Sequence, residues 1–478
     1  MSQKANLFVF AHLDSDFVPT GKLTLTEEGT GVQASEFVYG LKYLDRGNAV
    51  EIDPVSLSLA DRGRVRKQRL FPVDNLPLFG GIRDCAPDAW GRRVIEARRK
   101  VPMNSLPESV YLLEAGSQRV GALDVRESIS AEPREVLAKV TDLVWLLEAA
   151  ERIEAGLPVP QSLEAIFDSG SGLGGARAKA TVRDEDGVLW LAKFRSRGEI
   201  LDVPAIEAAT LHLAKACGLT VPQLKLINVG GRSVMLIRRF DRYWSHSLPG
   251  TTSAAGAIQP PATIPTPSGG APGGMPAWLQ AAPEPGMLEK RLPFVSGLTM
   301  LVCDEFSARE KSYADLAQAI RRYCHSGLIR QNNRELFARM VFNIFVSNDD
   351  DHLRNHGFIR YPEISGALGV SATQGGWGLS PLYDVMPRPG LASERNLFLG
   401  VGRLGRLATL DNAISTCPQF ALSEADALGI IATVWQQVRE WRVVFEQFGL
   451  SAPIIEQASS AMRHIDAIAS KSLRKAMP

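Results

Sequence analysis

A glycine-rich turn that leads into two extended runs is the feature that most restricts the fold of this chain. Residues 170–175 read Gly-Ser-Gly-Leu-Gly-Gly, which satisfies the G-x-G-x-x-G pattern. In a dinucleotide-binding fold this pattern opens a helix whose N-terminus binds pyrophosphate. Here two apolar runs, 180–183 and 188–194, follow with an Asp-Gly turn between them, which predicts a β-hairpin. The pattern therefore favours a kinase-like loop whose N–H groups cover a triphosphate, with a loop of no function as the alternative.

Lys193 lies on the second run of this hairpin, among apolar neighbours. Its ammonium group could bind the α- and β-phosphates, as the strand lysine of a kinase does, or could simply extend to solvent from a half-buried strand. Glu207, on a helix expected over residues 204–217, would either orient Lys193 or interact with the helix dipole. Residues 237–242 read as a strand end, where a hinge between lobes could meet an adenine.

Asp350 and Asn355 stand five positions apart in the polar run of residues 349–358. This is the Asp-x-x-x-x-Asn spacing of a phosphotransferase loop, in which the carboxylate takes the proton of the attacking hydroxyl and the amide holds a metal ion. Asp384, at the end of an expected strand, could hold the metal from the other side. His352 and His356 would also suit zinc, but no third ligand with recognisable spacing follows, so Mg²⁺ is favoured. A purely structural acidic turn is the remaining alternative.

Periodicity along the rest of the chain predicts an α+β fold. Short alternating runs in the first 60 residues predict strands, and a helical pattern begins near Asp84. Longer helical patterns occur at residues 133–155, 312–325, 334–347, 423–448 and 452–470. We expect a β-rich subdomain at 1–125, a kinase-like N-lobe at 126–246, an insertion at 247–286 and a helical C-lobe at 287–478.

The expected insertion differs in composition from the rest of the chain. Between Ser247 and Gly286, 16 of 40 residues are Pro or Gly, and only Glu284 is charged. Such a segment buries too little apolar surface to offset the entropy lost on ordering. We therefore expect it to be disordered or extended.

Bulk composition excludes several classes of protein. With 478 residues, 45% apolar, 22% charged and a net charge of +1, the chain has no general attraction to nucleic acid or membrane. Two basic stretches, 62–69 and 92–100, are either solvated faces or a surface for an acidic partner. Five scattered cysteines indicate a reducing compartment. Since no signal pattern and no apolar stretch of about 20 residues are present, we expect a cytoplasmic protein.

Five motifs in a fixed order resemble the HipA family of serine/threonine kinase toxins. They are residues 171–179 (Ser-Gly-Leu-Gly-Gly-Ala-Arg-Ala-Lys), 192–194 (Ala-Lys-Phe), 239–242 (Arg-Phe-Asp-Arg), 348–358 (Asn-Asp-Asp-Asp-His-Leu-Arg-Asn-His-Gly-Phe) and 379–384 (Leu-Ser-Pro-Leu-Tyr-Asp). The N-terminal part also resembles this family, at residues 37–39, 77–81, 90–92 and 121–123. The resemblance thus covers nearly the whole chain apart from the insertion.

This resemblance implies a two-lobed protein-kinase-like fold with an N-terminal β-rich subdomain and a mostly helical C-terminal lobe. It implies an enzyme that uses ATP and Mg²⁺ to phosphorylate a serine on a protein, typically an aminoacyl-tRNA synthetase, and thereby arrests growth and causes persistence. The implied partner is a small HipB-like helix-turn-helix antitoxin, through which the protein would reach operator DNA; no membrane partner is expected.

The resemblance also implies which residues bind the nucleotide. They fall in all five motifs: Gly174, Gly175, Ala176, Arg177, Lys179, Lys193, Arg239, Phe240, His352, Asn355, Tyr383 and Asp384. Residues of the first two motifs would contact the triphosphate, and those of the third would adjoin the adenine. Asp350 would be the catalytic base, and Asn355 and Asp384 would hold the metal.

One departure from the family pattern concerns autophosphorylation. The loop serine that members of the family phosphorylate aligns with Gly172 of this chain. Ser171 is adjacent, but a shift of one residue in an extended segment reverses the direction of the side chain. Self-inactivation is therefore expected to be lost or to have moved to Ser171.

Two other functions remain open from the sequence. The first is a non-catalytic protein that keeps the fold and acts with an antitoxin as a co-repressor of transcription, although the presence of Lys193, Asp350, Asn355 and Asp384 argues against it. The second is a phosphotransferase that acts on a small molecule.

Overall fold

The computed structural model describes residues 2–135, 137–172, 175–246, 275–362 and 375–477. The chain forms two compact units, each assembled from segments that are far apart in the sequence. The first unit consists of Met1–Gly198, Ile227–Thr251 and Ala281–Val302, and the second of Glu199–Leu226, Thr252–Gln280 and Cys303–Pro478. The four consecutive segments expected from the sequence stay a prediction.

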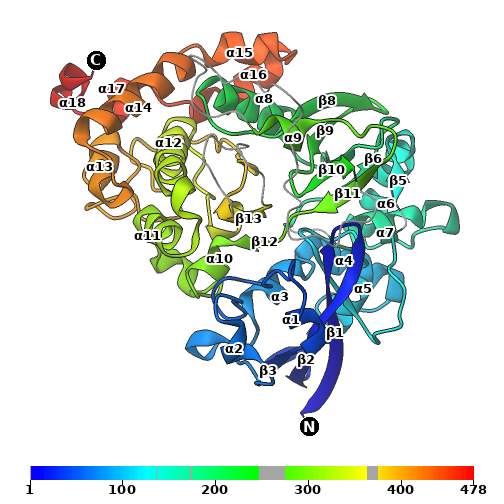
Figure 1. Ribbon diagram of the computed structural model, residues 1–478. Helices are drawn as coiled ribbons and strands as arrows, with labels where there is room; N and C mark the ends of the chain where they lie inside the picture. The colour runs from blue at the N-terminus through cyan, green and yellow to red at the C-terminus, as the bar shows by residue number, and fades with distance from the viewer. Residues whose placement is uncertain (1, 136, 173–174, 247–274, 363–374, 478) are drawn as a thin grey trace. The chain divides into compact units, whose positions relative to one another are not determined.

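An antiparallel sheet occupies the N-terminal part of the first unit, with the strand order β3-β2-β1-β4. Its strands are β1 (Gln3–Leu13), β2 (Asp16–Glu28), β3 (Gly31–Tyr39) and β4 (Leu123–Arg126). Leu7, Val9, Leu23, Leu25 and Phe37 alternate along three of these strands and belong to one buried core. The strands expected in the first 60 residues are thus confirmed, and they are drawn in blue in Figure 1.

A second sheet carries the glycine-rich motif, with the strand order β5-β6-β7-β9-β8. Its strands are β5 (Ala138–Lys139), β6 (Lys179–Arg183), β7 (Leu189–Phe194), β8 (Leu224–Val229) and β9 (Arg232–Arg238). β6 and β7 pair antiparallel, so the hairpin expected from the sequence is confirmed. Ala180, Val182, Trp190, Ala192 and Leu236 face one core, which helices α4 (Ala89–Arg99), α6 (Leu143–Glu154) and α7 (Ala165–Gly170) complete.

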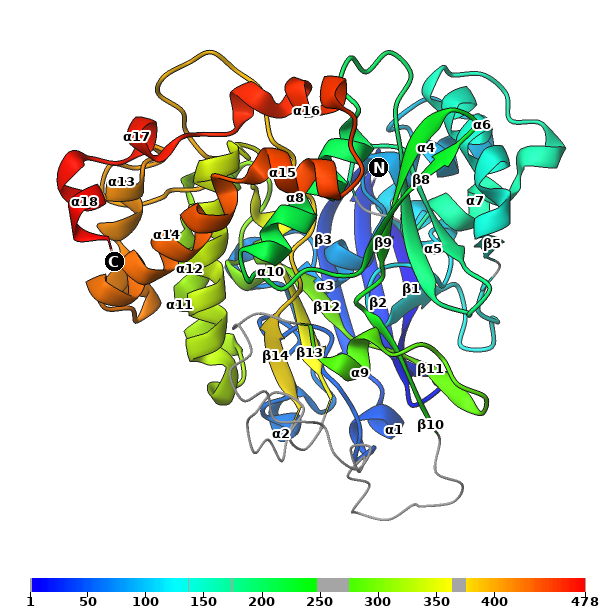
Figure 2. The same ribbon diagram turned by 90° about the horizontal axis from the view of Figure 1, so that it is seen from above.

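The second unit is mostly helical and is organised around α12 (Ile329–Val346). Residues 336–337 and 339–346 of this helix are buried, which places apolar and polar side chains on all its sides in the interior. It packs against α11 (Tyr313–Tyr323), α13 (Leu410–Ile414), α14 (Glu424–Val438) and α17 (Ile465–Ile468). Figure 2 shows α15 (Trp441–Gln447) lying against α8 (Val203–Ala216), and α16 (Ala452–Ala458) also contacts α8.

The remaining elements are short. They are α1 (Leu41–Leu44), α2 (Arg62–Val65), α3 (Gly80–Cys85), α5 (Glu108–Glu114), α9 (Ala277–Gln280), α10 (Gly297–Met300), α18 (Lys471–Ala476), β10 (Arg242–His246), β11 (Met287–Arg291), β12 (Phe294–Ser296), β13 (Gly357–Tyr361) and β14 (Gly376–Leu379). β13 and β14 form an antiparallel hairpin in the second unit. Within the described residues, no helix combines the length and the apolar composition that a membrane span requires.

Three expected elements differ in the structure. Of the helix expected at 133–155, only residues 143–154 are α-helical, after a 3-10 turn at Val140–Asp142, because residues 138–139 pair in parallel with β6 and Asp142 accepts a hydrogen bond from Lys139 N. The helix expected at 423–448 is divided between α14 and α15, and that at 452–470 between α16 and α17. Between α16 and α17, Arg463 N donates a hydrogen bond to Phe345 O of α12 in place of a bond within a continuous helix.

The Pro/Gly-rich segment at 247–286 is described only in part. Residues 247–274 lie outside the described residues. Residues 275–286 are described, contain α9, and bury Met275 and Leu279 in the structure. The end of the segment thus includes a short helix with two buried apolar side chains, and the expected disorder of the segment stays a prediction.

Candidate active-site residues

The glycine-rich turn follows α7 directly, and its course is set by steric limits. A side chain at Gly172 would place its Cβ 2.7 Å from Ala115 O and about 3.1 Å from the backbone of Arg119. Serine therefore does not fit at the position where the family serine aligns. Ser171 is 3% exposed and donates a hydrogen bond to Ala115 O (3.3 Å), so its hydroxyl is buried in this conformation. Gly174 lies outside the described residues.

Gly175 anchors the end of the turn to α4. Its N–H donates to Asp88 Oδ2 (2.9 Å), and its carbonyl accepts from Trp90 N (3.0 Å). Its φ of +84° is in the region that glycine adopts without strain. A Cβ here would lie 2.4 Å from Lys179 Nζ, so a larger residue would displace that ammonium group. Of the next residues in the turn, Ala176 is exposed and Arg177 is partly buried.

Lys179 and Lys193 are brought together by the register of the sheet. They are direct partners across the β6–β7 pair, so their side chains leave the sheet on the same face. That face is opposite to the one that packs on α4, α6 and α7, since Ala180 and Ala192 point into that core. Both lysines are 6% exposed. Two cationic side chains next to each other on one face of a sheet are suited to bind a multivalent anion such as a triphosphate.

Arg239 has a structural role that the sequence did not indicate. Its guanidinium bonds to both oxygens of Asp241 (2.9 and 2.6 Å), to the carbonyls of Gln118 and Arg119, and to Thr181 Oγ1. These bonds use all five N–H donors of the side chain. Burial acts against ionisation of Asp241, but the adjacent guanidinium groups hold the pKa of that carboxyl well below its usual value.

Arg239 therefore has no donor left for a nucleotide. Phe240, the next residue, is half-buried and its ring lies 6.4 Å from that of Phe294. The place of Arg239 and Phe240 beside an adenine stays a prediction.

The segment with the predicted catalytic residues of the second unit, called the catalytic turn below, begins where α12 ends. Ser347 adopts a left-handed conformation (φ 53°) and donates to Ala461 O (2.7 Å), which turns the chain out of the helix. In the turn that follows, Asn355 Nδ2 donates to the carbonyl of Asp350 (3.1 Å). The two residues that the spacing singled out are thus in direct contact. Because the amide nitrogen is used in this bond, the Asn355 side-chain oxygen is the atom suited to a metal ion.

Asp351 holds this turn from inside, although the motif gave it no role. It is 1% exposed and accepts hydrogen bonds from Tyr313 Oη, Asn343 Nδ2 (2.7 Å) and His356 Nε2 (2.9 Å). Burial acts against ionisation, but His356 and Tyr313 more than offset it and lower the pKa of Asp351. The sequence indicates this role only through the position of the three acids: where adjacent residues follow a buried helix, their side chains point in different directions, so one of them is expected to point inward.

Asp350 points in the other direction, toward solvent. Its side chain is 52% exposed and accepts a bond from Arg388 Nη2 (2.7 Å). Arg388 Nε also lies 3.1 Å from Asp349 Oδ1, so one guanidinium bridges two adjacent carboxylates. Burial raises the pKa of Asp349, and Arg388 opposes that shift. The sequence did not indicate Arg388, which lies 38 residues after Asp350.

The second metal ligand expected from the sequence, Asp384, follows β14 by five residues and has a left-handed backbone (φ 58°). Tyr383, beside it, donates to the carbonyl of Arg354 (2.7 Å), next to Asn355. The segment that carries Asp384 therefore lies against the turn that carries Asn355. Among the described residues, no three His, Cys, Asp or Glu side chains gather as a metal site. One carboxylate and one amide oxygen fit Mg²⁺ that phosphate oxygens and water complete.

His352 lies on the outer side of the same turn. Its ring meets that of Phe398 edge-on, with centroids 5.8 Å apart. Its Nδ1 is buried and has no hydrogen-bond partner within the described part of the chain. A buried ring nitrogen of this kind is suited to contact with a ligand, as its expected role beside the phosphates requires.

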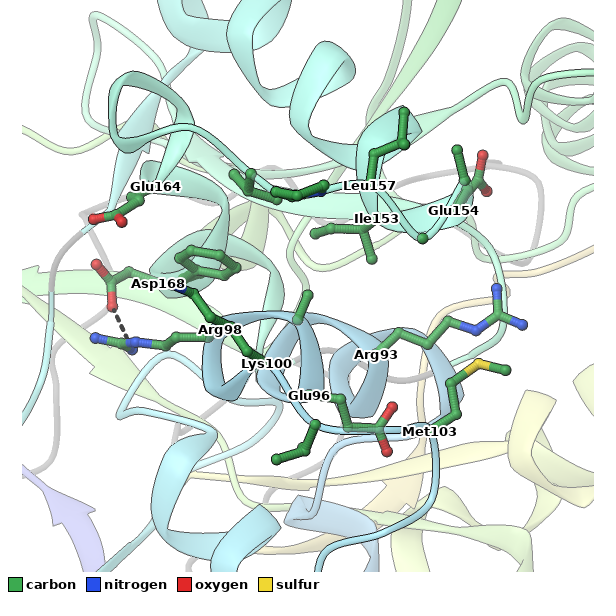
Figure 3. A pocket seen from close by; sticks show the side chains of 17 residues that line it. Arg93, Glu96, Arg98, Lys100, Met103, Ile153, Glu154, Leu157, Glu164 and Asp168 are labelled. Carbon is green, nitrogen blue, oxygen red and sulfur yellow. Dashed lines mark ion pairs between the residues drawn. The ribbon is translucent and has the colours of Figure 1, made fainter.

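A pocket of about 930 Å³ in the first unit lies elsewhere, between α4 and the segment of residues 153–168 (Figure 3). Ala97, Ile153 and Phe167 form part of its wall and also border the core behind the lysine-bearing sheet. An ion pair between Arg98 and Asp168 (3.5 Å) closes one end. None of the residues assigned to the nucleotide lines this pocket.

Comparison with known proteins identifies the family. Residues 171–442 match the family model described as the HipA-like C-terminal domain. The chain belongs to this family. Membership makes it a HipA-type serine/threonine kinase, an enzyme that uses ATP and is a toxin of a toxin–antitoxin system. The resemblance inferred from the five motifs is confirmed.

A solved structure agrees on the fold. The HipA-like chain matches HipA of Shewanella oneidensis MR-1, solved in a complex with HipB and its operator DNA, with a TM-score of 0.57, 13% identity and coverage of 94% of both chains. A match to the Helicobacter pylori proinflammatory kinase CtkA covers 64% of this chain and 95% of the CtkA chain, with 12% identity and a TM-score of 0.37. No curated protein matches the sequence. The expected α+β, kinase-like fold is confirmed.

Proposed function

We propose that this HipA-type kinase transfers the γ-phosphoryl group of Mg²⁺-bound ATP to a serine or threonine of a protein needed for translation, such as an aminoacyl-tRNA synthetase, and thereby arrests growth. The observation that carries the proposal is the catalytic turn. There Asn355 donates a hydrogen bond to the backbone carbonyl of Asp350, and Tyr383 fixes the segment of Asp384 against that same turn. Phosphoryl transfer to a hydroxyl uses a carboxylate as base and oxygen ligands for a metal ion, and this turn and the segment beside it supply those groups.

The residues of each unit have separate tasks in this proposal. Lys179 and Lys193 bind the triphosphate and lower the cost of bringing its charges into a buried site. Asp350 accepts the proton of the attacking hydroxyl, and the ion pair with Arg388 holds its carboxylate in one direction. Asn355 and Asp384 would hold Mg²⁺, which when bound neutralises charge on the transferred group. Positioning and charge neutralisation supply most of the rate in such reactions.

We further propose a small helix-turn-helix antitoxin as the regulatory partner, and contact with DNA mainly through it. Support comes from the matched Shewanella structure, in which HipA is in a complex with HipB and operator DNA. The chain itself has a net charge of +1, which agrees with indirect contact to DNA.

A phosphoproteome comparison tests the proposal. The wild-type chain and the Asp350→Ala variant are each expressed briefly, and phosphopeptides are quantified by mass spectrometry. We expect growth arrest and new phosphoserine or phosphothreonine sites only with the wild type. Arrest that persists with Asp350→Ala would support a non-catalytic co-repressor instead. Arrest without any new phosphopeptide, but with label from γ-labelled ATP in a small molecule, would support a small-molecule phosphotransferase.

A further inference from the structure

A short hairpin of residues 396–407 stands next to the catalytic turn in the second unit. Asn396 bridges to Leu407 and Gly402 to Gly405, so Arg403 and Leu404 form its tip. Arg403 is exposed and Leu404 is 64% exposed. The tip of the hairpin thus exposes an apolar side chain, Leu404, next to a cationic one, Arg403.

The hairpin is held firmly from within the second unit. Asn412 accepts from Leu404 N (2.8 Å) and donates to the carbonyls of Gly405 and Leu407 (3.1 and 2.9 Å). Gly402 approaches so closely that a Cβ would lie 2.0 Å from Asn412 O. Within its first strand, Gly400 exchanges two backbone hydrogen bonds with the segment of residues 311–313. A tip fixed in this way loses little entropy when it binds a partner.

Phe398 is the residue of the hairpin that contacts the catalytic turn. Its ring contacts His352, whose backbone N–H bonds to the carbonyl of Asp350 (2.8 Å). The guanidinium groups of Arg309 and Arg406 lie over the same ring, at 5.5 and 5.9 Å from its centroid. Two cations and an aromatic ring therefore flank the outer side of the catalytic turn.

The charge of this surface is not balanced locally. Arg309, Arg403 and Arg406 make no ion pair with any carboxylate in the described ranges. Residues 396–407 include no acidic residue, and Glu310 beside Arg309 is offset by Lys311. By contrast, the basic stretch of α4 is largely neutralised, since Arg92, Arg98 and Arg99 each pair with a carboxylate.

We propose that the hairpin surface, formed by Arg309, Phe398, Arg403, Leu404 and Arg406, binds an acidic segment of the protein substrate. The segment would carry Asp or Glu side chains for the three guanidinium groups and an apolar side chain for Leu404. Phe398 of this surface contacts His352, which lies two residues after Asp350, so the acidic side chains would lie close to the phosphorylated residue in the substrate sequence. This inference rests on the proposed kinase function and specifies its substrate class.

Binding is tested first, because it needs no catalysis. The probe is a fluorescein-labelled peptide, Glu-Glu-Ser-Leu-Glu-Glu, with a lysine-for-glutamate version as its counterpart. We expect the full-length protein to bind only the acidic peptide, with weaker affinity at higher salt. The double variant Arg309→Glu/Arg403→Glu should lose about tenfold in affinity. Arg439→Glu, at an exposed position at the end of α14, is the matched control and should change nothing.

Phosphorylation is tested next, with dephosphorylated casein as acidic substrate and myelin basic protein as basic substrate. We expect the double variant to raise KM for casein about tenfold while KM for ATP stays unchanged. Equal binding and equal KM for the variant and the wild type would overturn the inference. If no protein is labelled by any form, the proposed kinase function fails, while peptide binding still reports on the hairpin surface.

Discussion

The lysine-bearing sheet of the first unit and the catalytic turn of the second position their functional groups by different means. Lys179 and Lys193 owe their place to backbone register across β6 and β7. Asp350 and Asn355 lie in a turn whose shape depends on hydrogen bonds to one buried side chain, Asp351. Side-chain changes should therefore be tolerated structurally in the sheet and not in the turn, since ladder hydrogen bonds do not involve side chains.

The largest effect is expected for a change at Asp350, the proposed catalytic base of the turn. Asp350→Asn should lower phosphoryl transfer about 10²- to 10⁴-fold, because the amide cannot accept the proton, while ATP binding remains. Initial rates with γ-labelled ATP and calorimetric titration with ATP measure the two properties. Loss of ATP binding together with transfer would contradict the role of base. Asp186→Asn, in the β6–β7 turn, is the control and should leave both properties unchanged.

The next effect tests the interior of the turn. Asp351→Ala leaves Tyr313, Asn343 and His356 without their common acceptor, and should lower the free energy of unfolding by about 3–5 kcal/mol. Urea unfolding followed by circular dichroism gives the value. The adjacent Asp349→Ala, whose side chain is 43% exposed, should cost less than about 1 kcal/mol. Equal losses for the two variants would show that Asp351 does not organise the turn.

The sheet offers the opposite expectation. Lys193→Met should weaken ATP binding about 10- to 100-fold, since a charge-assisted contact is lost. The free energy of unfolding should change by less than about 1 kcal/mol, because methionine keeps most of the side-chain volume and the backbone hydrogen bonds of β7 are unaffected. Lys225→Met, at an exposed position of β8 in the same sheet, is the matched control. Unfolding of Lys193→Met would mean that the lysines are part of the structural core.

The stability that Asp351 gives to the turn should depend on pH. The pKa of Asp351 is lowered in the folded state from the usual 3.8, so its ionised form stabilises the protein above that pH. This contribution is lost as the pH falls through the folded pKa. As the pH falls below about 4, the stability of the wild type should therefore fall more steeply than that of Asp351→Asn. Parallel curves in acid unfolding experiments would contradict the lowered pKa.

The smallest effect concerns the exposed ion pair of the turn. Arg388 is 54% exposed, and solvent screens its attraction to Asp350. Arg388→Ala should therefore lower kcat by no more than about fivefold, with Arg388→Lys in between. Steady-state rates at two salt concentrations measure this. A loss above a hundredfold would place Arg388 in contact with the reacting groups.

Local patterns in the sequence were sufficient for the elements that local physics decides. The β6–β7 hairpin was predicted because an Asp-Gly turn between apolar runs restricts the backbone within a few residues. The contact between Asp350 and Asn355 followed from a spacing that one turn of chain can close. The strand β5 was missed because two residues pair with a partner more than 40 positions away, and helical periodicity does not report such pairing.

The sequence by itself determined the family, the α+β class and the residue types available for phosphoryl transfer, because these depend on motifs and on periodicity. Only the tertiary structure decided which of three adjacent acids points inward, and that all five N–H donors of Arg239 form hydrogen bonds within the protein. It also decided that Arg388 meets Asp350 across 38 residues. The physical reason is that the direction of a side chain depends on what packs around it, and those neighbours come from distant parts of the chain.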